Sequence, residues 1–180
     1  MCYQVKWRTC LKMKASKFIG MTVLDNDAKE AGKIAELEIK LKNCLVDKIW
    51  VATGSALNKK YFSVKEEDLD KIGDYVQLKL NGEAIDLKTK VNKLGEQAES
   101  GSLFKDIVGK TVITDDAMEV GKVSDMIIDP KGCLIHNVLI STGPAFRKKH
   151  LTVSDEDIHS FGDYAILNFD KEEVNKRITD

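Results

Sequence analysis

The chain has 180 residues, of which 43% are hydrophobic and 32% are charged, so it holds enough apolar material for one core or two small ones. Its formal net charge of -1 and its pI of about 6.3 argue weakly against a dedicated nucleic-acid binder, which usually carries a basic excess. No apolar run reaches the ~18 residues that a transmembrane helix needs, and residues 1–14 lack the apolar segment of a signal peptide, so we expect a cytoplasmic protein without membrane insertion.

One stretch of the sequence occurs twice. Residues 18–80 align with residues 107–169 at a constant offset of 89 and without a gap. Many non-identical pairs exchange one apolar residue for another, and the identical pairs include Gly20/Gly109, Thr22/Thr111, Gly32/Gly121, Cys44/Cys133, Gly54/Gly143 and Asp74/Asp163. A gapless match of this length indicates a duplicated module, and the long period favours two small domains over a solenoid.

Each copy contains a regular series of short strands separated by turns. In the first copy we expect strands at 19–24, 33–41, 45–53, 61–64 and 75–80, and the second copy repeats this series. The apolar alternation in 33–41 changes register, which predicts a β-bulge. Short strands with a turn signal at every junction are typical of a small antiparallel sheet that closes into a barrel, since closure removes exposed edges. The predicted fold is therefore mostly β, with two tandem antiparallel β-barrels.

A helix is expected between the two copies, over residues 83–99. Leu87, Val91, Leu94 and Ala98 share one face of this helix, which we expect to pack on a barrel. Residues 172–176 align with its start and predict a shorter trailing helix after the second copy. We therefore expect five segments: a tail at 1–12, a first barrel at 13–82, a helix and linker at 83–101, a second barrel at 102–170 and a helix remnant at 171–180.

The pattern resembles the PRC-barrel domain family. In the second copy the resemblance rests on the following residues: Gly109, Val112, Glu119, Gly121-Lys122-Val123, Asp129-Pro130, Val153-Ser154-Asp155-Glu156-Asp157-Ile158 and Gly162-Asp163. The first copy keeps most of these but has Lys40-Leu41 in place of Asp-Pro. Tandem copies of this kind resemble archaeal members of the family.

What the resemblance implies is partner binding without chemistry. Similar barrels occur in a photosynthetic reaction-centre subunit, in a ribosome maturation factor and in archaeal modulators of cell division. On this basis we expect a protein that is not an enzyme and needs no cofactor.

The residues themselves give no pattern of a catalytic or metal site. His136, His150 and His159 all lie in the second copy, whereas a duplicated site should be preserved in both. Cys44 and Cys133 hold equivalent places without zinc-ligand spacing, so we interpret them as small buried residues. The acidic turns at 66–68 and 155–157 are expected to be helix starts, because negative groups favour a helix N-terminus.

One surface feature is present in both copies and is our candidate partner-binding site. An apolar residue at the tip of a predicted loop is followed by a basic run; the residues are Leu57, Lys59, Lys60, Phe146, Arg147, Lys148 and Lys149. Such a site suits a protein partner or RNA, with Phe146 as an anchoring or stacking residue.

Three functions stay open at this point. We favour an adaptor that binds a protein partner, in archaeal cell division or another assembly process, with homodimerisation as a further expectation. The first alternative is an RNA- or ribosome-associated factor that binds through Lys59-Lys60 and Arg147-Lys149. The second is a regulator that binds a small ligand or a metal.

Overall fold

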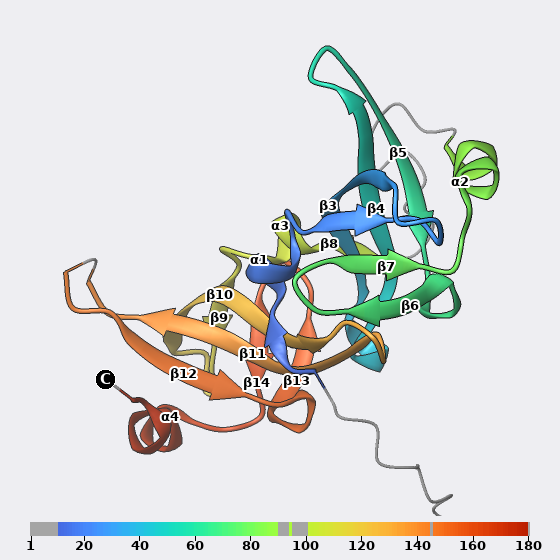
Figure 1. Cartoon of the computed structure of the whole chain (residues 1–180). Coiled ribbons are helices and arrows are strands. Elements are labelled where there is room, and N and C mark those ends of the chain that lie inside the picture. Colours follow the sequence, from blue (N-terminus) through green and yellow to red (C-terminus); the bar gives the residue numbers. More distant parts are fainter. Residues whose placement is uncertain (1–10, 90–93, 95–100, 145, 180) are drawn as a thin grey trace, which may run out of the picture.

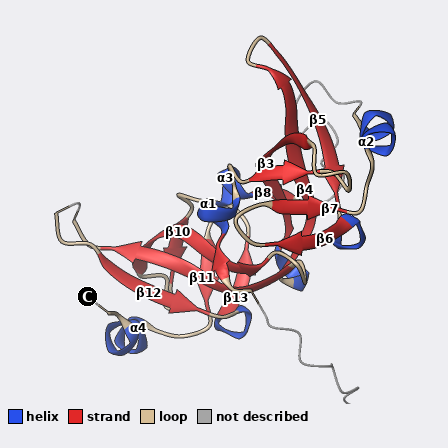
Figure 2. Cartoon of the chain, viewed as in Figure 1, coloured by secondary structure: helices blue, strands red, loops and turns tan. Residues whose placement is uncertain are grey.

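The computed structural model describes residues 11–89, 94, 101–144 and 146–179, and they form a mostly β protein (Figures 1 and 2). We call residues 11–89 the first half and residues 101–179 the second half. The first half contains β1 (Met13–Lys14), α1 (Ala15–Phe18), β2 (Thr22–Leu24), β3 (Glu30–Lys40), η1 (Leu41–Asn43), β4 (Leu45–Ser55), β5 (Asn58–Val64), η2 (Glu66–Asp68), β6 (Leu69–Ile72), β7 (Val76–Leu78) and α2 (Gly82–Lys88). The second half contains β8 (Ser102–Leu103), α3 (Phe104–Ile107), β9 (Thr111–Ile113), β10 (Glu119–Asp129), β11 (Leu134–Thr142), β12 (Lys149–Val153), η3 (Asp155–Asp157), β13 (Ile158–Phe161), β14 (Ala165–Leu167) and α4 (Lys171–Arg177).

The same strand pairing occurs in both halves. Strands β2, β3, β4 and β5 pair antiparallel in this order, as do β9, β10, β11 and β12. A short hairpin, β6–β7 or β13–β14, joins through its second strand to β2 or β9. That last pairing is parallel in each half, so the prediction of a purely antiparallel sheet was wrong.

The prediction of closed barrels is also not met. The described strands form one open sheet with the order β13-β14-β9-β10-β11-β4-β3-β2-β7-β6, and no pairing joins its two ends. The sheet instead bends strongly. Register shifts occur in β3 between Ile34 and Glu36 and in β10 between Val123 and Asp125, which confirms the predicted bulge.

A glycine in β3 and another in β10 allow these strands to lie close to their neighbours, β4 and β11. A Cβ on Gly32 would lie 2.2 Å from the backbone oxygen of Ala52, and a Cβ on Gly121 would lie 2.2 Å from that of Ser141. Any larger residue would push β3 away from β4, or β10 away from β11.

The two halves exchange their first segments. Strand β1 of the first half pairs with β10 of the second, and β8 of the second half pairs with β3 of the first. The only described pairing between the central strands is Leu45 with Leu134, residues that are equivalent in the two copies. The chain therefore has an approximate twofold axis at this pair, and each half is completed by the other.

Hydrogen bonds to two buried carboxylates follow the same approximate symmetry. The backbone N–H and hydroxyl of Ser16, in α1, donate to Asp125 in β10. The backbone N–H of Lys105, in α3, donates to Glu36 in β3, the counterpart of Asp125. Burial raises the pKa of Glu36, and the backbone N–H groups of Leu37 and Lys105, which donate to its carboxylate, oppose the rise. Each carboxylate thus accepts a hydrogen bond from a backbone N–H of the helical turn that the other half contributes.

A single apolar core runs through both halves. It contains Phe18 and Val23 from the first half and Ile107 and Val112 from the second, all with no exposed surface. One continuous core is what reciprocal exchange requires, because neither half alone covers its own bent sheet.

The two trailing helices are equal in length and similarly anchored. Helix α2 begins at the N-cap Asn81 and α4 at the N-cap Asp170, and each N-cap side chain accepts a backbone N–H of the first turn. Ile85 and Val174, equivalent residues, anchor the helices in the core. The expectation of a truncated second helix was wrong.

The predicted helix over 83–99 is wrong in its length, since α2 ends at Lys88. Leu87 is 72% exposed and so does not join a docked apolar stripe. Leu94 packs near Trp50 and Leu103, whereas Val91 and Ala98 lie outside the described residues.

A cation near the end of each trailing helix binds an aspartate of a capping box. The Lys88 Nζ lies 3.1 Å from Asp68, and the Arg177 guanidinium lies 2.8 Å from Asp157. These aspartates also accept the backbone N–H of Lys65 and Ser154. The predicted reading of the acidic turns as helix starts is confirmed by the short helices η2 and η3.

The Asp157 contact predicts a stability effect that depends on pH. Burial raises the pKa of Asp157, but the Ser154 amide and Arg177 outweigh burial, so the net pKa lies below its ordinary value. A lowered pKa in the folded state gives stability that is present above the unfolded pKa of about 3.9 and is lost as pH falls further. Asp157→Asn should therefore lower the free energy of unfolding by about 1 kcal/mol at pH 7 and much less near pH 3.

Urea unfolding at both pH values measures this difference. Asp163→Asn, in an exposed turn, is the control and should have no effect. An equal loss at pH 7 and pH 3 for Asp157→Asn would contradict the assignment.

Within the described part of the chain, no helix has the length and apolar character to cross a membrane.

Candidate partner-binding surface

The two hairpins that carry the predicted site project from different ends of the molecule (Figure 1). In the β4–β5 hairpin, residues 56–57 form a two-residue turn, and Leu57 at its tip is fully exposed. In the β11–β12 hairpin the connection is longer, over residues 143–148, and Phe146 is 90% exposed. Among the described residues these two have the largest exposed fractions of any large apolar side chain. Single exposed apolar residues are common on protein surfaces, so what makes these two candidates for a contact site is that both copies have one at the same place.

Lys59 and Lys60, the basic residues that follow Leu57, do not form a single surface patch. Lys60 pairs with Thr53 and Lys59 with Gly54 on β4. Because successive strand residues point to opposite faces, Lys59 and Lys60 lie on opposite sides of the hairpin. The structure therefore separates two residues that the sequence placed together. Of the second run, Arg147 and Lys148 are exposed and Lys149 is half-buried at the start of β12.

Lys59 lies with residues of β3 and β4 in a groove, which we call the first groove. Its volume is about 400 Å³, and its lining includes Glu30, Gly32, Lys33, Ala52, Gly54 and Lys59. The register explains the arrangement, since Lys33 faces Ala52 and Lys59 faces Gly54 two residues further along β4. The floor consists of small residues, and the longer side chains that line the groove are those of Glu30, Lys33 and Lys59.

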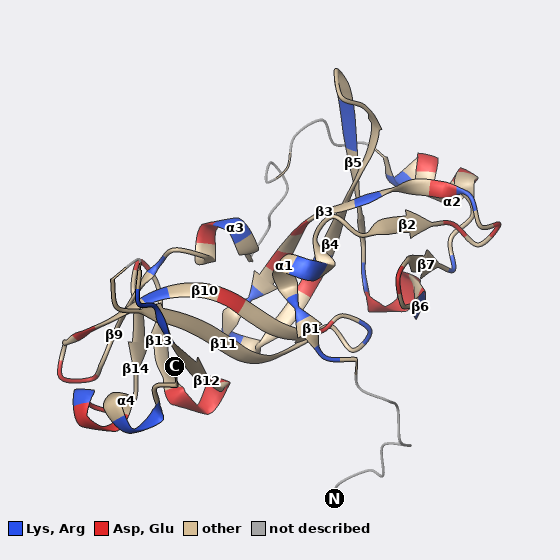
Figure 3. Cartoon of the chain, turned by 60° about the vertical axis from the view of Figure 1, so that its left-hand side comes forward, with Lys and Arg blue, Asp and Glu red and all other residues tan. Residues whose placement is uncertain are grey.

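The second half has an equivalent groove, the second groove. Its volume is about 550 Å³, and its lining includes Glu119, Gly121, Lys122, Ser141, Gly143 and Lys148, each the counterpart of a first-groove residue. Lys171, at the start of α4, adds a further cation, where the first copy has Gly82. Figure 3 shows basic segments on β5 and at the start of β10, in the two halves.

Sequence reasoning missed Lys33, Lys122 and Lys171. A signal for the first two was present, because both copies have Lys after the glycine at 32 or 121. What was missing was the strand register that brings this lysine beside the hairpin.

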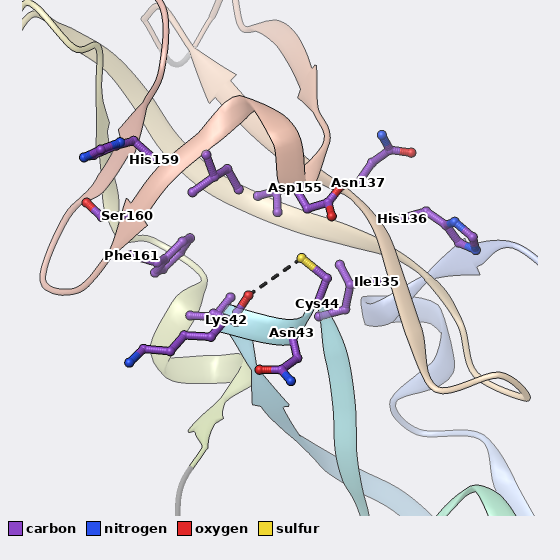
Figure 4. A pocket seen from close by; sticks show the side chains of 13 residues that line it. Lys42, Asn43, Cys44, Ile135, His136, Asn137, Asp155, His159, Ser160 and Phe161 are labelled. Carbon is purple, nitrogen blue, oxygen red and sulfur yellow. Dashed lines mark hydrogen bonds between the residues drawn. The ribbon is translucent and has the colours of Figure 1, made fainter. Parts of the chain in front are cut away.

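A further pocket, of about 510 Å³, lies between the halves (Figure 4). Its lining is mainly apolar and includes Cys44, Ile135, Val138, Ile158 and Phe161, with Lys42 and Asp155 among the polar residues. Two of the histidines, His136 and His159, also line it, and Figure 4 shows their rings on opposite sides. Nothing in this arrangement resembles a catalytic pair.

The surroundings of both cysteines disfavour the reactive thiolate form. Burial, together with nearby acidic groups such as Glu66 and Asp129, raises the pKa of the Cys133 thiol to about 12. Burial likewise raises the pKa of Cys44, which is only half-buried. The expectation of burial is thus confirmed for Cys133 and met only in part for Cys44. Each thiol donates to a carbonyl three residues earlier, on Leu41 or Pro130.

No group of three or more His, Cys, Asp or Glu side chains able to hold a metal ion occurs within the described ranges.

Comparison with known proteins places the second half in a family. Residues 99–174 match the model of the PRC-barrel domain. The match begins before β8 and ends inside α4, so it covers the second groove and the β11–β12 hairpin. None of the curated proteins matches the chain. The chain therefore contains a PRC-barrel domain at residues 99–174, within a mostly β fold.

Proposed function

We propose that this protein is a non-enzymatic adaptor that binds protein partners through the two hairpins. The observation that carries the proposal is that both halves present an exposed apolar tip, Leu57 or Phe146, beside a lysine-walled groove. Aromatic residues and arginine are enriched at the centres of protein interfaces, which fits Phe146 and Arg147 of the second hairpin.

We further propose that residues 13–82 are a second, tandem PRC-barrel unit. In support, the alignment at an offset of 89 is matched by the same strand pairings in both halves, including the unusual parallel pair. The assembly process that the adaptor serves is expected to be of the archaeal type, with cell division as one case.

The approximate twofold axis bears on homodimerisation. The surfaces that would meet in a dimer of single units, β1 with β10 and β8 with β3, already meet inside this chain. Partners are therefore expected to bind the hairpins and not these strands.

Replacing both apolar tips tests the proposal. Leu57→Ser with Phe146→Ser should lower the recovery of a cross-linked protein partner at least tenfold, because an interface anchor contributes 2 kcal/mol or more, on the order of a thirtyfold change in affinity. The fold should be unaffected, since both side chains lie in water.

The measurement is quantitative cross-linking in the source cell, with Tyr75→Ser and Tyr164→Ser as the control pair. These tyrosines are also equivalent and about half exposed, at 56% and 55%, but lie outside the hairpins. Unchanged recovery in the tip variant would remove the proposal, and loss of recovery after nuclease treatment would favour the RNA alternative.

A further inference from the structure

The first and second grooves are more alike than the halves that contain them. Eight residues line the first groove, and the counterparts of all eight line the second. Six of these eight pairs are identical, against 24 of the 63 aligned pairs in the two copies as a whole. The strand packing described above explains Gly32 and Gly121, and a positive φ, of 88° and 86°, explains Gly54 and Gly143. Backbone packing does not explain why the two lysine pairs, Lys33/Lys122 and Lys59/Lys148, are identical.

Some lysines of the described chain contact an acceptor through Nζ: Lys40 contacts Asp47, Lys88 contacts Asp68, and Lys131 contacts the backbone oxygen of Asp70. The Nζ atoms of the groove lysines make neither an ion pair nor a hydrogen bond with the described residues. Each groove thus holds two exposed ammonium groups that are available to a ligand.

The shape of the groove favours an extended chain. The floor is formed by strand residues that are small or lack a side chain, such as Gly32 and Gly54 in the first groove. A main chain can therefore lie along the floor while its acidic side chains reach the lysines on the walls.

The lining argues against a nucleic acid as the occupant. Among the described residues neither groove has an aromatic side chain on which a base could stack.

We propose that each groove binds one extended, acidic peptide segment, so that one chain holds two such segments. This rests on the proposed adaptor function and names its partner: a protein with acidic, extended segments. The second groove binds more tightly than the first, because Lys171 gives it one more positive charge. The Lys171 Nζ donates to the backbone oxygen of Glu119, which holds the ammonium group at the groove edge.

The test is a ¹H–¹⁵N NMR titration of the whole chain with a ten-residue peptide of alternating Glu and Gly. Two separate sets of shifts are expected, one at residues 30–33 and 52–59 and one at residues 119–122 and 141–148. The dissociation constant of each set should rise several-fold between 50 and 200 mM salt, since screening weakens exposed charge pairs. The same peptide with Gln for Glu should not bind.

Three variants assign the effect to the grooves. Lys33→Ala with Lys59→Ala should weaken the first set about tenfold and leave the second unchanged. Lys122→Ala with Lys148→Ala should do the reverse. Lys171→Gly, which installs the residue of the first copy, should bring the two affinities together. Lys17→Ala with Lys71→Ala removes two exposed lysines outside the grooves and is the matched control.

The proposal is overturned by an absence of shifts at millimolar peptide, by shifts outside the grooves, or by groove variants that behave as the control. Tighter binding of a ten-nucleotide uridine oligomer would overturn the choice of a protein partner. Groove shifts that depend on protein concentration alone would show that the occupant is a second copy of this chain.

Failure here is distinguishable from failure of the adaptor function. If the peptide does not bind but the tip variant still loses its cross-linked partner, the adaptor function stands and the acidic ligand is wrong.

Discussion

Phe18→Ala should destabilise both halves of the protein, although Phe18 belongs to the first. Its side chain has no exposed surface and lies in α1, whose Ser16 donates to Asp125 of the second half. Truncating a buried Phe to Ala typically costs 3–5 kcal/mol. Because native domains are stable by about 5–15 kcal/mol, this loss is a large fraction of the total and should lower the melting temperature by roughly 10 °C or more.

The measurement that checks this prediction is hydrogen exchange read separately on β3 and β10. Protection should fall by a similar factor on both strands, because the exchanged segment links them. Leu57→Ala is the control: its side chain is fully exposed, and the substitution should change stability by less than about 0.5 kcal/mol. Loss of protection confined to β3 would contradict reciprocal exchange.

The second prediction with a large effect concerns the second half expressed alone. Residues 101–180 should form a homodimer, because without the first half β10 loses the pairing that β1 provides. A second copy can replace it, since β8 already pairs with β3, the counterpart of β10. The Lys105 amide would then donate to Asp125 of the other copy, as it now donates to Glu36.

Light scattering on the fragment after gel filtration checks this prediction and should give twice the fragment mass. The expected dimer is isologous, with the same surface contributed by both copies. A matched fragment that begins at residue 109, without β8 and α3, should not dimerise. A folded monomer of residues 101–180 would contradict the account, and so would an unfolded chain, because either would show that β8 cannot take the place of β1.

Much of the local structure was predictable because it depends on nearby residues. The glycines, the register change after Gly32 and the capping box at Ser154 and Asp157 each act over a few positions. The internal duplication then allowed each element to be predicted twice. In these respects the sequence is locally consistent with the fold.

The pairing of distant segments was not predictable in the same way. In each copy the short segment before the first helical turn meets a strand whose counterpart has almost the same sequence pattern. Pairing of β1 with β3 or with β10 would bury similar groups, so local patterns do not distinguish the two. The parallel pairing of β2 with β7 was missed for a related reason, because an apolar three-residue strand carries no sign of direction.

The candidate site was predicted in part. Leu57 and Phe146 are exposed at hairpin tips, as the apolar residue between turn signals indicated. The grouping of Lys59 with Lys60 was not right, because strand geometry puts them on opposite faces. The groove lysine Lys33 comes from another strand, and only the register between β3 and β4 reveals it.

Differential scanning calorimetry of the intact chain tests most directly whether the two halves form one cooperative unit that presents two binding ends. The account predicts a single transition, with equal calorimetric and van't Hoff enthalpies, that moves as a whole to lower temperature in Phe18→Ala. Two transitions, of which Phe18→Ala shifts only one, would contradict it.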